Sequence, residues 1–128
     1  MYKLLMWEKN QLTLKNQANF SGIGLHSGIK VEVTLEPANS NSGIVFRRTD
    51  LEKDNEIVAN FKNVSSAKLC TKIQNSSGAS VSTIEHLMAA FYICGIDNII
   101  VNINGPEVPI MDGSAKDFVK IIKDCGLK

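Results

Sequence analysis

A glutamate followed directly by a histidine is the combination in this chain best suited to hydrolytic chemistry. Glu85 and His86 stand at the start of a segment whose apolar residues follow helical spacing. An imidazole can bind a metal, and a neighbouring carboxylate can act as a general base. The pattern leaves a structural interpretation open for both residues. The run from Ser82 to Glu85 has the spacing of a helix capping box, and His86 could be an ordinary surface histidine.

The helical spacing also predicts which way His86 points. At about 100° per residue, one side of the helix carries an apolar stripe. This stripe consists of Ile84, Leu87, Met88 and Phe91. His86 falls on the opposite side, together with Ala90 and Ile93. We therefore expect His86 to lie outside the core that the stripe forms.

The other candidate groups have no spacing that fixes a metal site. His26 lies in a glycine-rich stretch and Cys70 stands alone, so both are loose candidates for ligands. A catalytic zinc usually takes three protein ligands, and the HExxH arrangement is absent because Ala90 stands where its second histidine would be. Asp112 precedes a predicted helix and could cap it. We therefore expect no complete metal site from these residues alone.

Composition favours a soluble, cytoplasmic, single-domain protein. The chain has 128 residues, 44% of them hydrophobic, and a formal net charge of +1. Clustered lysines and arginines are absent, which argues against nucleic-acid binding. The three cysteines form no disulfide or zinc-knuckle spacing, so we expect free thiols. No stretch is long and apolar enough for a transmembrane segment.

The periodicity predicts an α+β fold. Alternating apolar residues predict strands at 11–20, 30–36, 44–47 and 98–104, with a tight glycine-rich connection at 21–28. Residues 50–80 suggest short strands in a small inserted sheet. Helices are predicted from the capping box to Gly95, and from a cap at Ser114 to a stop near Gly126. Short connections favour a mainly antiparallel sheet, with the two helices on one face of a two-layer sandwich.

Several segments, taken in order, resemble the amino-terminal domain of the UDP-3-O-acyl-N-acetylglucosamine deacetylases. They are GIGLHSG at 22–28, FRRTDL at 46–51, LCT at 69–71, STIEHL at 82–87, GIDN at 95–98 and PIMDGSA at 109–115. The resemblance implies a zinc-dependent hydrolase of lipid A biosynthesis in Gram-negative bacteria. It covers 11–128, so we expect residues 1–10 to be an extension and 11–128 to be the first domain of a two-domain enzyme.

The resemblance also implies roles for individual residues. His86 would bind zinc and Glu85 would be the general base, while Cys70 and Thr71 would line the cleft near the metal. His26 and Asp112 would lie nearby. A second domain would supply the remaining His and Asp ligands, together with an acid for the leaving amine. The substrate would be a nucleotide-sugar lipid, bound between the domains.

Two other interpretations stay open. The chain could be a stand-alone binding module that keeps the fold without the chemistry, or a homodimer in which two copies of His86 hold zinc. If it is one domain of two, we expect it to be inactive alone. The face that meets the second domain should then expose apolar side chains.

Overall fold

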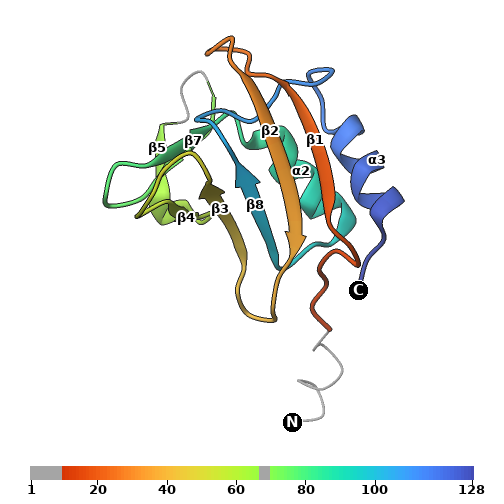
Figure 1. Cartoon of the computed structure of the whole chain (residues 1–128). Helices are drawn as coiled ribbons and strands as arrows, with labels where there is room; N and C mark the ends of the chain where they lie inside the picture. Colours follow the sequence, from red (N-terminus) through yellow and green to blue (C-terminus); the bar gives the residue numbers. More distant parts are fainter. Residues whose placement is uncertain (1–9, 67–69) are drawn as a thin grey trace.

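The computed structural model describes residues 10–66 and 70–128. Within these two ranges it contains two sheets, two α-helices and one short 3-10 helix (Figure 1). The elements are β1 (Ala18–Ile23), β2 (Lys30–Pro37), β3 (Ile44–Arg48), β4 (Glu56–Val58), η1 (Phe61–Asn63), β5 (Val64–Ser66), β6 (Lys72–Gln74), β7 (Ser80–Ser82), α2 (Glu85–Cys94), β8 (Ile99–Ile103) and α3 (Lys116–Cys125). Residues 1–9 of the predicted extension, and Leu69, lie outside this range.

The main sheet has five strands in the order β1-β2-β8-β3-β4. Every pairing is antiparallel except that of β3 with β8. β8 lies between β2 and β3, and its alternate residues Ile99, Val101 and Ile103 are buried. The predicted mainly antiparallel sheet is confirmed, although insertion of β8 separates two strands that are neighbours in sequence.

Both α-helices cover one face of this sheet, as predicted (Figure 1). Phe118 of α3 packs on Phe20 of β1 with ring centroids 5.3 Å apart. Burying a side chain of this size stabilises the fold by roughly 1.5–3 kcal/mol. Neither α-helix is long and apolar enough to cross a membrane, within the residues described. The expected α+β two-layer architecture is therefore confirmed.

A second, three-stranded sheet of β5, β6 and β7 forms the predicted insertion. Arg48, at the end of β3, joins the two sheets. Its guanidinium donates to the Ser80 carbonyl at 2.9 Å and forms an ion pair of 2.7 Å with Asp50. This hydrogen-bonded pair holds the pKa of Asp50 below its ordinary value. The inserted sheet is thus fastened to the main sheet on the side that leads into α2.

The first predicted strand was placed too early. β1 begins at Ala18 and runs to Ile23, through the first residues of the predicted glycine-rich connection. The preceding segment is extended but pairs with the end of the chain. The Thr13 N–H donates to the Lys128 carbonyl, and the Lys15 N–H donates to the Gly126 carbonyl. Its alternating pattern came from this separate contact, in which Leu14 is buried.

Both predicted helix caps also differ from the structure. Ile84 is the N-cap of α2 and Ala115 is that of α3, and neither makes a side-chain capping bond. Ser82 belongs to β7, and its hydroxyl donates to the Pro106 carbonyl. Ser114 lies one residue before the cap, where its Oγ accepts the Lys116 N–H at 3.2 Å. The predicted stop at Gly95 is confirmed by its left-handed φ of 74°.

Candidate active site

Glu85 is the first residue of α2, and its carboxylate does not close a capping box. Its Oε1 instead accepts the backbone N–H of Thr71 at 3.3 Å. The Ile84 N–H donates to the Thr71 carbonyl, also at 3.3 Å, so the start of α2 is fixed to the segment leading into β6. The structure therefore brings together Glu85 and Thr71, two of the residues selected from the sequence.

His86 lies in the first turn of α2 and is half-buried. The prediction placed Ala90 and Ile93 with His86 on the side of the helix away from the core, and this is wrong for Ala90. Ala90 is fully buried, whereas Ile93 is 62% exposed. The buried face of α2 therefore consists of Leu87, Ala90 and Phe91. The helix α2 also packs against α3.

A pocket of about 300 Å³ opens beside Glu85. Its lining is mainly apolar and comes from the start of α2, the inserted sheet and the segment before it. The lining residues are Ala59, Asn60, Val64, Thr71, Ile73, Ile84, Glu85 and Met88. Cys70 is half-buried next to Thr71. Glu85 thus contributes a carboxylate to the wall of a hollow that is otherwise poor in charge.

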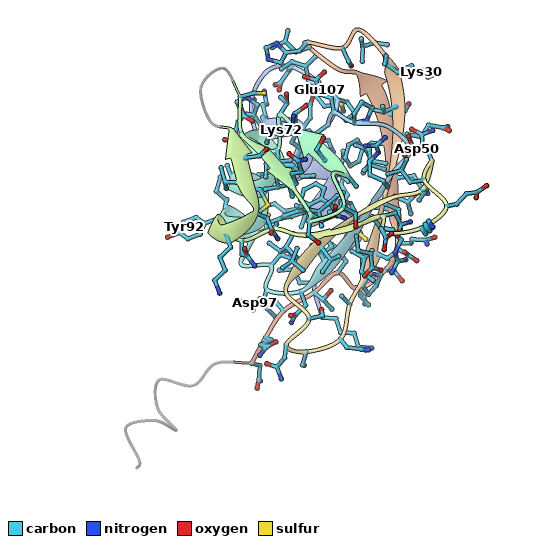
Figure 2. All side chains as sticks on the ribbon, turned by 90° about the vertical axis from the view of Figure 1, so that its left-hand side faces the viewer. Lys30, Asp50, Lys72, Tyr92, Asp97 and Glu107 are labelled. Carbon is cyan, nitrogen blue, oxygen red and sulfur yellow. The ribbon has the colours of Figure 1, made fainter. Side chains whose placement is uncertain are left out.

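His26 lies in the connection between β1 and β2, and its side chain is exposed. The backbone of this connection is bound by the side chain of Glu107, a residue that was not selected from the sequence. The Glu107 carboxylate accepts the backbone N–H of Ser27 at 2.8 Å and that of His26 at 3.1 Å. Glu107 is only 1% exposed (Figure 2 labels its position).

Glu107 also binds the residue that leads into α2. The Thr83 hydroxyl donates to Glu107 Oε2 at 2.6 Å. Burial would raise the pKa of Glu107, but the hydrogen bonds from Thr83, Ser27 and His26 outweigh it and hold the pKa below its ordinary value. Glu107 is therefore a buried, ionised carboxylate, and both of its oxygens accept hydrogen bonds.

Thr83 has an unusual backbone conformation for its type. Its φ of 59° lies in the left-handed region, which a β-branched residue rarely occupies. Such a conformation costs about 1–3 kcal/mol and persists only where the surroundings enforce it. The hydrogen bond to Glu107 supplies part of that constraint, two residues before Glu85.

Asp112 is exposed in the connection between β8 and α3. Its Oδ1 accepts the Ser114 hydroxyl at 2.9 Å and the Ser114 N–H at 3.0 Å. These bonds lower the pKa of Asp112. Within the described residues, no hydrogen bond or ion pair joins Asp112 or the His26 side chain to Glu85 or His86. Asp112 therefore organises the turn before α3, and the prediction that it could cap the helix is wrong, because the N-cap is Ala115.

The donor set allows only a partial metal site. His86 offers one imidazole, and the described residues contain no group of three His, Cys, Asp or Glu side chains able to hold a metal ion. A catalytic zinc needs about three protein ligands. His86 fits one position of such a site, and further ligands would have to come from residues not described. The cysteines at 70, 94 and 125 are free thiols, as expected.

The sequence of this chain matches a known family and several curated proteins. The family model LpxC, described as UDP-3-O-acyl N-acetylglycosamine deacetylase, matches residues 11–128. UDP-3-O-acyl-N-acetylglucosamine deacetylases from Geotalea uraniireducens and Geobacter sp. strain M21 are 58% and 57% identical over 118 residues. Those 118 residues are 92% of this chain and 38% of each relative. The enzyme of that name from Aliivibrio fischeri is 45% identical, with 39% of its length covered. The chain thus spans less than half of these relatives.

Proposed function

The chain belongs to the family of UDP-3-O-acyl N-acetylglycosamine deacetylases, and we propose that it contributes a general base and one zinc ligand to such an enzyme. Glu85 is the base and His86 the ligand. Residues 11–128 form the first domain, and a second domain supplies the other ligands. The reaction is hydrolysis of the acetamide of UDP-3-O-acyl-N-acetylglucosamine, a cytoplasmic step of lipid A biosynthesis in Gram-negative bacteria.

The observation that carries this proposal is the position of Glu85. A carboxylate in a capping box would be turned back toward the helix backbone and occupied there. Glu85 instead lines a pocket and, among the residues described, accepts one N–H, from Thr71, on one of its two oxygens. The other oxygen can accept a proton from an attacking water.

The division of work follows from the groups present. When bound, zinc would lower the pKa of a water and polarise the amide carbonyl. His86 would hold the metal through one ring nitrogen, on the residue next to the base. The Thr71 N–H keeps the Glu85 carboxylate oriented toward the pocket that it lines. The amine that leaves needs a proton from an acid of the second domain.

Exposed apolar residues support a partner surface on α2. Tyr92 and Ile93 are 88% and 62% exposed, and Tyr92 extends away from the molecule (Figure 2). Neighbouring large side chains left in solvent are typical of a face that another domain covers. This agrees with the apolar surface expected for one domain of two.

Combining this chain with the matching second domain and zinc tests the proposal. Acetate release from UDP-3-O-acyl-N-acetylglucosamine should appear only with both parts. Glu85→Ala should lower the rate by about 10²–10⁴-fold, the usual contribution of a general base. His86→Ala should reduce bound zinc as well as rate. Glu52→Ala, at an exposed position between β3 and β4, is the matched control. Normal activity in both site variants would refute the assignment, and an inactive wild-type combination would favour a binding module.

A further inference from the structure

Residues 106–110 lie between two segments that carry proposed site residues. On one side, this stretch pairs with Ser82 in a parallel bridge, with the Val108 N–H donating to the Ser82 carbonyl at 3.1 Å. On the other side, Pro109 pairs with Gly24, and the Ile110 N–H donates to the Ile23 carbonyl at 2.9 Å. The backbone thus places one short stretch of chain between the end of β7 and the end of β1.

The side chain of Glu107 forms hydrogen bonds with the same two parts of the chain. Its Oε1 accepts the Ser27 N–H, its Oε2 accepts the Thr83 hydroxyl, and the His26 N–H lies 3.1 Å from both oxygens. We propose that Glu107 is a positioning residue that fixes the loop of His26 relative to the start of α2, where Glu85 and His86 lie. This inference rests on the proposed function for the meaning of those residues.

The surroundings leave the carboxylate little freedom. Gly24 packs directly over it, because a Cβ at Gly24 would overlap Glu107 Oε1 and lie 3.0 Å from its Cδ. The hydroxyl donor on the other side comes from Thr83, whose left-handed backbone turns the chain into α2. A shift of the carboxylate therefore disturbs the His26 loop and the approach to Glu85 together. Reacting groups misplaced by about 1 Å can lose about 10²-fold in rate.

The first test measures the anchoring in this chain without catalysis. Glu107→Gln keeps the size of the side chain but has one acceptor oxygen and no charge. Hydrogen exchange of the His26 and Ser27 amides should become about tenfold faster or more, the effect of losing one hydrogen bond to a charged group. The Lys128 amide, which donates to the Thr13 carbonyl, is an internal reference that should not change. Unchanged exchange at His26 and Ser27 in a folded variant would overturn the proposal.

The second test separates positioning from stability in the combined two-domain protein. Glu107→Gln should lower kcat about 10–100-fold with little change in KM, because the loss is in alignment of reacting groups. Ile99→Val, a core change at the start of β8 where the strand pairs with Pro37 and Ile44, should lower stability and leave kcat unchanged. A normal kcat with faster amide exchange would overturn the role in positioning the site.

Thr83→Val provides a second variant should Glu107→Gln not fold. Valine keeps the shape and removes only the hydroxyl that binds Glu107. We expect kcat to fall while the His26 and Ser27 amides stay protected; an unchanged kcat would contradict the proposal. No deacetylation by the wild-type combination would refute the proposed function instead, and the exchange result would then decide the anchoring on its own.

Discussion

The contact between Gly24 and Glu107 makes a quantitative prediction about stability. In Gly24→Ala, the new Cβ overlaps Glu107 Oε1 and lies 2.5 Å from the Ser27 hydroxyl. Relief requires the carboxylate to move, which breaks its 2.8 Å bond with the Ser27 N–H. Overpacking of this kind costs about 1–3 kcal/mol, and a hydrogen bond to a charged group contributes about 1.5–3 kcal/mol. Because both costs apply, we expect Gly24→Ala to lower the free energy of unfolding by about 3 kcal/mol.

Glu107→Ala should lower the free energy of unfolding by a similar amount, but for a different physical reason. It leaves the Thr83 hydroxyl, on a residue only 3% exposed, without its acceptor. An unsatisfied buried polar group costs about 1–3 kcal/mol. The freed N–H groups of His26 and Ser27 lie in an exposed loop and can bind water.

The two changes should not be additive, because alanine at 107 removes the atoms that the new Cβ would meet. We expect the double variant to be at least about 1 kcal/mol more stable than the sum of the single effects, whereas distant pairs add within about 0.3–0.5 kcal/mol. Urea unfolding at pH 7 followed by circular dichroism measures all four proteins. Ile99→Val combined with Glu107→Ala is the additive control. Additivity of Gly24→Ala with Glu107→Ala would show that the glycine is not required by Glu107.

Three further predictions concern charges and thiols. The pKa of Glu107 is lower in the folded chain than its unfolded value of about 4.3, so its ionisation stabilises the fold above that value, and this stabilisation is lost as the pH falls through the folded pKa. The difference in unfolding free energy between wild type and Glu107→Gln should therefore become smaller when the pH is lowered from 6. A difference that stays constant would contradict the ionised state of Glu107. Arg48→Lys should lower the free energy of unfolding by about 1–2 kcal/mol, because lysine cannot bind Asp50 and the Ser80 carbonyl with the same fork; chemical denaturation checks this, and an unchanged midpoint would refute the fastening role. Burial raises the pKa of Cys94, so iodoacetamide should alkylate it more slowly at pH 8 in the folded chain than in urea, as mass spectrometry of the modified peptides can show; equal rates would count against a shielded thiol.

The architecture could be predicted because it depends on local periodicity. β2 alternates buried and solvent-facing residues, and α3 buries Phe118 and Ile122 on the predicted stripe. Strand order could not be predicted in the same way. The place of β8 is set by its pairing with β2 on one edge and β3 on the other. Both partners are distant in sequence, so local periodicity does not specify this order.

The capping box failed for a related reason. The pattern of Ser82 and Glu85 specifies groups that could cap a helix, and it does not specify where the helix begins. Ser82 is held in β7 by backbone bonds with the 106–108 segment. Thr83 then takes a left-handed conformation, and the helix starts at Glu85. Tertiary pairing thus removed the cap and left Glu85 on the pocket wall.

Glu107 shows most clearly why part of the site escaped the sequence. Its donors are 24, 80 and 81 residues away, so no local spacing could connect them. One signal was present: a single acidic residue in Gly105-Pro106-Glu107-Val108-Pro109, a stretch with little else that is polar. A charged side chain there must either reach solvent or be paired with hydrogen-bond donors. Because Gly105, Val108 and Pro109 are buried in the structure, the carboxylate must be paired. Sequence motifs therefore identify the groups that could react, whereas the group that holds them in place is identified by its buried charge and the donors around it.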